Sequence, residues 1–422
     1  MKVIRTTGRG LAAIAALTGR RATPYERVLP QARNIVESVR RGGDTALLHL
    51  RSKFDSIPPQ SPLRIPEIEL QLAWESTPEH FRRALKIAAR NIRAFAKRQR
   101  PKNFDLKPAP GVMTGQRVIP LASVGCYIPS GRYPLPSTLL MTAIPAQVAG
   151  VERIVAVSPH PAKETLAAAC FLGITEFYRV GGAQAIAALA YGIETIPRVD
   201  KIAGPGNAWV TAAKKLVAFD CSIDMLAGPP EAVITSETGD PARIAADLVA
   251  QAEHDPDALA IFITTQASMA KSVSAAVTKF ARGNKIATAA IANNGLAIVA
   301  RSLEEARDIT NQIAPEHLTI DSVADLAWVR NAGSVFIGRW SAQPLGDYVS
   351  GPNHTLPTGG LARTRGGLSA LDFVKLVTVQ EYSKQGVQQL GPAALRLANA
   401  EGLTAHAQAI RARGVNNRGV HD

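Results

Sequence analysis

The chain has 422 residues, of which 46% are apolar, 19% charged and 5% aromatic, so it can bury a large core and is neither a disordered nor a fibrous protein. Lys and Arg number 48 against 34 Asp and Glu, and residues 1–107 alone hold 22 basic and 9 acidic side chains. Nearly all of the positive excess of 14 therefore lies in the first quarter of the chain.

The cysteine content and the hydropathy set the expected environment of the protein. Three cysteines occur without a CxxC pair, which argues against a disulfide framework and predicts a reducing, cytoplasmic location. No window approaches the roughly 18 apolar residues of a membrane span, so we expect no membrane partner.

The N-terminal quarter predicts an arm followed by helices. The short apolar run at residues 11–17 is rich in Ala and precedes Arg20 and Arg21, which predicts an amphipathic arm over residues 1–22 rather than a signal peptide. Between residues 24 and 100 apolar side chains recur at helical spacing and basic residues fill the other faces. Binding of nucleic acid is the weaker interpretation of this charge, because neither interleaved aromatic residues nor a known motif accompanies it.

The middle of the chain changes to an alternation of strands and helices. A passage rich in Pro and Gly, residues 108–137, includes a predicted strand at 118–124. The strands predicted next are 154–157, 177–180 and 201–203, and the helices are 162–171, 183–191 and 209–219. This order predicts parallel βαβ units in a doubly wound sheet.

The alternation resumes after a candidate hinge at residues 226–231. The predicted strands are 232–235, 260–264, 296–300 and 318–320, and the predicted helices are 241–253, 266–282 and 303–313. A glycine-rich stretch, 351–367, then precedes a helical C-terminus at 371–413.

The fold class that follows is α/β, with two doubly wound, degenerate Rossmann-like domains, a helical N-terminal segment and a small helical C-terminal domain. After the arm, we predict a discontinuous main domain, an inserted domain and a C-terminal domain. Their ranges are 23–125 with 228–369, 126–227, and 370–422.

Two glycine turns are candidates for binding phosphate groups, because parallel sheets bind ligands at the carboxyl ends of their strands. These are residues 180–184 and 203–207. Neither matches GxGxxG, since Trp209 stands where the third glycine of the second turn would fall. Ordinary βα turns therefore remain an alternative at this point.

The predicted helix 241–253 suggests a metal site. Asp247, Gln251 and His254 fall within about 60° of one another on a helical wheel, apart from the apolar face. Side chains at positions i and i+3 can reach one metal ion. A purely structural role for His254 is the competing interpretation.

Other histidines stand beside possible acids and oxygen ligands. Glu316 and His317 follow Pro315 at the end of a predicted helix, where a carboxylate beside an imidazole can act as two proton acceptors. His354 lies in a loop-like run with Asp347. A Glu-His dipeptide alone does not identify a site, since residues 78–80 repeat Pro-Glu-His without such neighbours.

Taken together, these motifs resemble the histidinol dehydrogenase family. They occur in the family's order between about residues 118 and 406: Gly204-Pro205-Gly206-Asn207-Ala208, Ala227-Gly228-Pro229 with Glu231, Ala250-Gln251-Ala252-Glu253-His254-Asp255, Ala314-Pro315-Glu316-His317-Leu318, Leu345-Gly346-Asp347-Tyr348, Gly351 with Asn353-His354, and Glu401 to His406.

The resemblance implies an oxidoreductase that uses Zn²⁺ and NAD. L-histidinol would be oxidised through a bound aldehyde to L-histidine, the last steps of histidine biosynthesis, with two NAD consumed. His317 would take the hydroxyl proton, and Glu316 would activate water to attack the aldehyde. The alternative is a related zinc- and NAD-dependent dehydrogenase of another small polar alcohol.

The family's binding residues also carry over by position. The ligands of a single Zn²⁺ in each subunit would be Gln251, His254, Asp347 and His406. The substrate would touch these four residues together with His317, His354 and Glu401. The NAD contacts would be Tyr127, Gln184 and Asn207, in the inserted domain.

One position departs from the family, and one implication concerns assembly. The family usually has a serine near the substrate where this chain has Pro230, so the serine's hydroxyl group is missing here. The resemblance also implies a homodimer with shared active sites, in which His406 and Glu401 of each chain complete the other subunit's site. We expect no nucleic acid among its partners.

Overall fold

The computed structural model describes residues 1–20, 24–130 and 133–415, so the last two residues of the predicted arm, 21 and 22, lie outside the described residues. The chain divides into two units. Unit 1 comprises Met1–Gln99 and Ala122–Phe373, and unit 2 comprises Arg100–Leu121 and the chain from Val374 onward.

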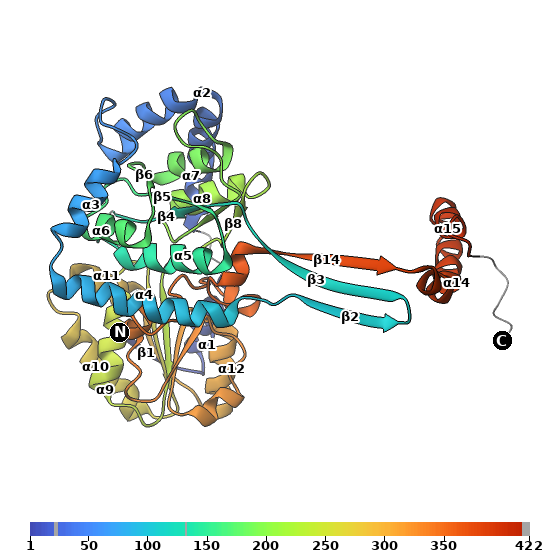
Figure 1. The fold of residues 1–422 in the computed structure, drawn as a ribbon. Helices are drawn as coiled ribbons and strands as arrows, with labels where there is room; N and C mark the ends of the chain where they lie inside the picture. Colours follow the sequence, from blue (N-terminus) through green and yellow to red (C-terminus); the bar gives the residue numbers. More distant parts are fainter. Residues whose placement is uncertain (21–23, 131–132, 416–422) are drawn as a thin grey trace. The chain divides into compact units, whose positions relative to one another are not determined.

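A five-stranded parallel sheet organises the first half of unit 1 (Figure 1). In spatial order its strands are β6 (Glu176–Tyr178), β5 (Arg153–Val157), β4 (Ser123–Tyr127), β7 (Lys201–Ala203) and β8 (Ser222–Ile223). The intervening helices are α5 (Pro136–Ala149), α6 (Lys163–Leu172), α7 (Gly182–Tyr191) and α8 (Ala208–Val217). The strand order reverses between β4 and β7, which is the place where such sheets bind ligands.

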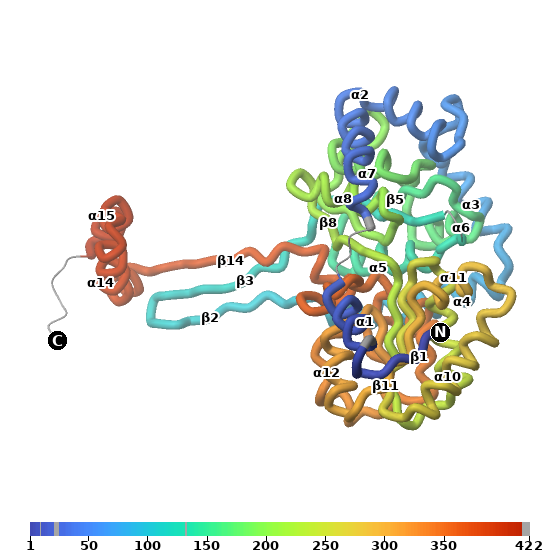
Figure 2. The backbone as a smooth tube through the Cα atoms, turned by 180° about the vertical axis from the view of Figure 1, so that it is seen from behind, coloured from blue at the N-terminus to red at the C-terminus, as the bar shows by residue number. Residues whose placement is uncertain are grey.

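The helices that precede this sheet in the chain cover it. They are α2 (Leu29–Asp55), α3 (Glu67–Glu75) and α4 (Glu79–Gln99). Figure 2 shows α2 lying over α7 and α8, and these three helices share one core of buried apolar side chains. The predicted N-terminal helices therefore exist, and their apolar faces pack against the α/β layers.

A six-stranded parallel sheet organises the second half of unit 1. In spatial order its strands are β1 (Lys2–Arg5), β11 (Gly295–Val299), β10 (Leu259–Thr264), β9 (Glu231–Thr235), β12 (His317–Ile320) and β13 (Ser334–Ile337). Its main helices are α9 (Pro241–Ala252), α10 (Ala267–Phe280), α11 (Lys285–Asn294) and α12 (Leu303–Ile313). Here the order reverses between β9 and β12.

The N-terminal arm is part of this sheet's layer. Strand β1 pairs in parallel with β11 at the sheet edge, and α1 (Arg9–Thr18) lies beside α12 (Figure 2). Ile14 and Leu17 of α1 are buried in the same core as β9, β10 and β12. The predicted amphipathic segment therefore packs as a helix, and its apolar face covers the sheet.

Unit 2 contains a three-stranded antiparallel sheet and two helices. The strands, in spatial order, are β14 (Val374–Tyr382), β3 (Val112–Pro120) and β2 (Phe104–Ala109), and the helices are α14 (Lys384–Ala400) and α15 (Thr404–Arg411). The prediction of helix from residue 371 is wrong over β14, which pairs with β3 along its whole length. The strand predicted at 118–124 is instead the end of β3 and the start of β4.

Short elements complete the fold. They are α13 (Gln343–Tyr348) and the 3₁₀ helices η1 (Pro24–Val28), η2 (Val323–Ala327), η3 (Leu361–Arg363) and η4 (Ala370–Phe373). Across residues 1–20, 24–130 and 133–415, no helix has both the length and the apolar character needed to cross a membrane.

Candidate active site

The predicted acid–base pair lies at the amino end of a central strand. Helix α12 ends at Ile313, Ala314 adopts a left-handed conformation with φ of +51°, and β12 begins at His317. Because β12 lies between β9 and β13, this corner is enclosed, and Glu316 and His317 are only 8% and 3% exposed. Ligands usually bind at the carboxyl ends of parallel strands, so this position differs from the usual arrangement.

Two donors hold the carboxylate of Glu316. Its Oε2 accepts hydrogen bonds from the backbone N–H of Glu231, at 2.8 Å, and from Nε2 of Gln251, at 3.1 Å. The same oxygen lies 3.7 Å from Nδ1 of His317. The carboxylate and the imidazole are therefore neighbours in a buried, hydrogen-bonded setting.

His317 is fixed on three sides. Its Nδ1 lies 3.3 Å from Nε2 of Gln251, and its Nε2 lies 3.3 Å from Oδ1 of Asp347. The ring stacks on Phe336 with the centroids 5.7 Å apart. Burial lowers the pKa of His317, but the charge of Glu316 and the hydrogen bond with Asp347 together outweigh burial and raise this pKa to about 10.

Asp347 connects several imidazoles. Burial raises the pKa of its carboxyl group, but the hydrogen bond with His317 and the charges of His317, His354 and His254 outweigh burial and lower this pKa. The backbone oxygen of Asp347 lies 2.8 Å from Nδ1 of His354, whose Nε2 lies 3.3 Å from Oγ1 of Thr138 on α5. Burial keeps the pKa of His354 below its ordinary value, although the Asp347 charge opposes it.

A pocket opens beside these groups. Its lining includes Phe95, His317, Phe336, Asp347, Asn353 and His354. It therefore presents one carboxylate and two imidazoles against an apolar wall, which suits a small polar molecule with an apolar ring.

The fold explains why Gln251 and His254 reach the same place. Helix α9 follows β9 and runs back along the sheet, so its C-terminal end lies at the amino edge of the strands. Helix α13, which carries Asp347, packs against α9. The structure thus brings Gln251, Glu316, His317 and Asp347 into contact, and the charge of His254 acts on Asp347. That these residues act together in one reaction stays a prediction.

The two remaining residues of the predicted zinc and substrate sites belong to unit 2. Glu401 is the C-cap of α14 and His406 lies in α15, and both are exposed. Throughout the part of the chain that the structure describes, no three His, Cys, Asp or Glu side chains are grouped so that they could hold a metal ion. The predicted zinc set is not such a group, because it includes an amide and is divided between the units.

The three predicted NAD residues lie at the carboxyl edge of the five-stranded sheet. Tyr127 ends β4, and its hydroxyl accepts a 3.1 Å hydrogen bond from the N–H of Gly182. Gln184 lies in the first turn of α7, and Asn207 caps α8 by accepting from two backbone N–H groups. Tyr127 and Asn207 flank the reversal between β4 and β7.

Sequence reasoning did not select Asp55, which lies among these residues. Its Oδ2 accepts from the N–H of Gly181, at 3.0 Å, and from Nε2 of Gln184, at 3.2 Å. Asp55 ends α2, far away in the chain, and no local motif marks it. Glu231 and Phe336 were also absent from the predicted site residues, although Glu231 lies within one of the quoted motifs.

Neither Cys126 nor His80 has the surroundings that a catalytic group needs. Cys126 is fully buried, and burial raises the pKa of its thiol to about 12, which disfavours the thiolate that a nucleophile requires. His80, in the repeated Pro-Glu-His triplet, is exposed near the start of α4.

Comparisons with known proteins agree on one family. The family described as histidinol dehydrogenase matches residues 18–414. The histidinol dehydrogenase of Methanothermobacter thermautotrophicus is 45% identical over 413 residues, covering 95% of this chain and 96% of the relative, and that of Geobacillus kaustophilus is 46% identical over 393 residues, covering 90% and 92%. The crystal structure of histidinol dehydrogenase from Elizabethkingia anophelis has a TM-score of 0.92 at 34% identity and covers 98% of each chain.

Proposed function

Because the chain belongs to the histidinol dehydrogenase family, we propose that it oxidises L-histidinol through a bound aldehyde to L-histidine, using Zn²⁺ and two NAD. The observation that carries this proposal is the buried pair of Glu316 and His317 beside a pocket that also holds Asp347 and His354. Oxidation of an alcohol to an acid needs two proton acceptors at one carbon atom, and this pair supplies them.

His317 acts as the base in the first oxidation. His317 lines the pocket, and its neutral imidazole would accept the hydroxyl proton as the alcohol carbon gives up hydride. A cation bound at Asp347 would cancel part of the negative charge that raises the pKa of His317, which favours the neutral imidazole that this step requires.

Glu316 acts as the base in the second oxidation. Two donors orient its carboxylate by hydrogen bonds to Oε2, namely the N–H of Glu231 and the amide of Gln251. The same Gln251 amide also contacts His317. The carboxylate removes a proton from water as the water attacks the aldehyde, and the resulting hydrate can lose a second hydride.

The donor chemistry at the amino edge of the six-stranded sheet fits Zn²⁺. Nε2 of Gln251 points at Glu316, which leaves its Oε1 as the end of the amide that can bind a cation. His254 and Asp347 add an imidazole and a carboxylate, and the C-terminal end of α9 carries partial negative charge that favours a cation. Zn²⁺ held by these residues would position the imidazole and the amine of the substrate.

NAD is proposed to bind at the carboxyl edge of the five-stranded sheet. Tyr127 and Asn207 flank the reversal of strand order, and Gln184 lies in the first turn of a helix that begins with two glycines. Dinucleotides bind doubly wound sheets at such reversals.

We also propose a homodimer in which Glu401 and His406 complete the active site of a second copy. Unit 2 exposes many large apolar side chains to solvent, and extended exposed apolar surfaces mark interaction sites. The exposed side chains are Phe104, Leu106, Ile119, Leu376, Val377, Tyr382, Leu390, Leu397 and Leu403.

The three free cysteines support the cytoplasm as the location of the protein.

The decisive experiment measures NADH formation from histidinol by purified protein, with and without a chelator. Two NADH per histidinol are expected, together with loss on chelation and recovery with Zn²⁺. No NADH from either histidinol or histidinal in the presence of Zn²⁺ would contradict the proposal. Mixing Glu316→Gln with His406→Ala chains tests the shared site, since only mixed dimers then contain one intact site.

A further inference from the structure

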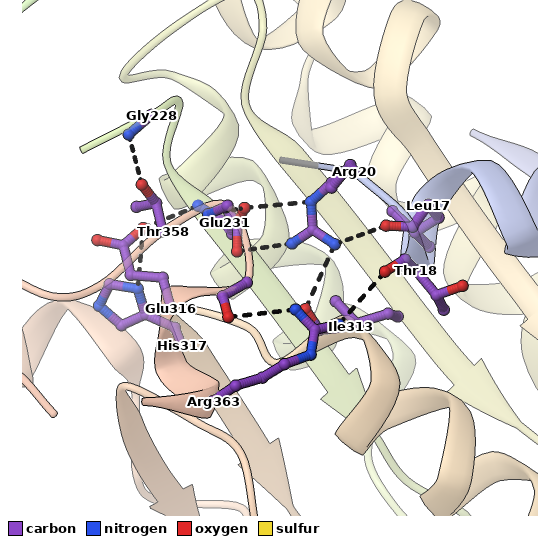
Figure 3. Close-up of polar contacts among 12 residues, drawn as sticks. Leu17, Thr18, Arg20, Gly228, Glu231, Ile313, Glu316, His317, Thr358 and Arg363 are labelled. Carbon is purple, nitrogen blue, oxygen red and sulfur yellow. Dashed lines mark hydrogen bonds and ion pairs between the residues drawn. The ribbon is translucent and has the colours of Figure 1, made fainter. Parts of the chain in front are cut away.

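Glu231 has two separate roles next to the proposed base. It is the first residue of β9 and is 2% exposed. Its backbone N–H donates the 2.8 Å hydrogen bond to Oε2 of Glu316. Its side chain points away from Glu316, toward the N-terminal segment of the chain (Figure 3). The position of Glu231 therefore decides where one of the two donors to Glu316 lies.

Arg20 holds the side chain of Glu231. Nε of Arg20 donates to Oε1 at 3.2 Å, and Nη2 of Arg20 lies 2.7 Å from Oε2. Oε1 also accepts from the N–H of Gly359, at 2.8 Å. A buried carboxylate needs a cation and donors of this kind, so the two side chains depend on each other.

The other end of the Arg20 guanidinium reaches the corner from which Glu316 projects. Nη1 donates to the backbone oxygens of Leu17, at 2.8 Å, and Ile313, at 3.4 Å, which lie at the ends of α1 and α12. Ile313 directly precedes Ala314, the buried residue with φ of +51°. A non-glycine residue keeps such a conformation only where its surroundings enforce it.

Arg20 therefore contacts two segments of the chain that meet at Glu316. On one side it fixes the strained corner that leads into Glu316, and on the other it fixes the residue whose N–H orients the carboxylate (Figure 3). We propose that Arg20 and Glu231 are positioning residues for Glu316, which hold its carboxylate where it can activate water for oxidation of the aldehyde. This inference rests on the role proposed above for Glu316.

The chain offers a matched control in Arg363. Its Nη2 donates to the backbone oxygens of Thr18 and Gln312. These two residues are the chain neighbours of Leu17 and Ile313, whose carbonyl groups Arg20 binds. Arg363 thus fixes the same two helix ends, but its hydrogen bonds are to those carbonyls and to Gly360, whereas the Glu231 carboxylate is bound by Arg20 and Gly359. Comparing the two arginines separates docking of α1 from positioning of Glu316.

The test measures the two oxidations separately, as single turnovers of histidinol and as steady-state oxidation of added histidinal, in Zn²⁺-loaded protein. We expect Arg20→Gln to lower kcat for histidinal by about 10- to 100-fold, because a misplacement of about 1 Å has effects of this size. KM for histidinal and the first oxidation should change little. Arg20→Lys should recover part of the loss because it keeps the charge. Arg363→Gln frees the same helix ends but leaves the Glu231 carboxylate bound, so it should cause a much smaller loss than Arg20→Gln.

A second variant covers the case in which Arg20→Gln fails to fold. Glu231→Gln keeps the backbone N–H and the shape of the side chain but loses the charge that binds Arg20, and it should slow histidinal oxidation selectively. Equal loss of both oxidations, or the same loss in Arg363→Gln, would overturn the inference. Glu316→Gln serves as the reference: if it does not slow histidinal oxidation selectively, the role proposed for Glu316 fails instead.

Discussion

Replacing Asp247 by Asn should stabilise the protein in a manner that depends on pH. Asp247 lies on α9, one turn before Gln251, and accepts a hydrogen bond from the backbone N–H of Gln343, the first residue of α13. Burial raises the pKa of this carboxyl group from 3.8 to about 6, although that hydrogen bond opposes the shift. The carboxylate thus helps to attach the helix that carries Asp347, at the cost of a buried charge.

The magnitude follows from the size of the pKa shift. A shift of about two units corresponds to about 3 kcal/mol at 1.36 kcal/mol per unit. Asp247 is only partly buried, so solvent screening reduces the expected value to about 1–2 kcal/mol. Because the folded-state pKa is the higher one, this penalty is absent below about pH 4, grows as the pH rises, and is fully present above about pH 6.

Urea-induced unfolding of the wild type and Asp247→Asn at pH 5 and pH 8 provides the assay. The amide can still accept from Gln343, so the variant should be more stable at pH 8 by about 1–2 kcal/mol, with a smaller difference at pH 5. Asp308→Asn, on an exposed position of α12, measures the effect of removing one surface carboxylate. A difference that is equal at both pH values, or a variant that is less stable at pH 8, would refute the reasoning.

Two further predictions concern the binding regions. Lys214 and Asp224 form a 2.6 Å ion pair with side chains 4% and 1% exposed, so Lys214→Met should cost about 3–5 kcal/mol in urea unfolding by leaving a buried charge unpaired. Adding Asp224→Asn, which removes the charge but keeps an acceptor for the N–H groups of Gly204 and Met225, should recover part of this loss. No recovery would show that the unpaired charge is not its cause. Pro230→Ser restores the hydroxyl usual in the family and should lower KM for histidinol by up to about 10-fold, the equivalent of one neutral hydrogen bond. An unchanged KM would place the side chain of residue 230 away from the substrate.

The sequence predicted both parallel sheets because each of their central strands is a short apolar run next to a helix with a clear period. Strand β1 was missed because its partner β11 lies almost 300 residues further along the chain. Strand β14 was read as helix because its partner β3 lies more than 250 residues earlier in the chain. Local patterns do not carry such long-range pairings. The predicted domain boundaries stay a prediction.

Candidate residues could be chosen from local sequence, whereas their place in the fold could not. Gln251, Glu316 and His317 could be selected because side-chain chemistry and the order of motifs are local properties. That these residues meet at the amino edge of a sheet depends on the direction in which α9 runs back from β9. The contacts of Arg20 were beyond local reasoning altogether, because the guanidinium joins residues 17, 231 and 313.

The basic first quarter of the chain contains positive charges that bind acceptors inside the molecule. Arg51 is fully buried, and its guanidinium donates to the backbone oxygens of Pro58, Pro59, Ser61 and Pro62. Arg20 likewise combines two carbonyl oxygens with one carboxylate. Only a planar group with five donors can satisfy several fixed acceptors in this way, which explains why arginine rather than lysine stands at both positions. Part of the positive excess is therefore required by the folding of the N-terminal segments onto the two sheets, and in the case of Arg20 by the geometry of the active site.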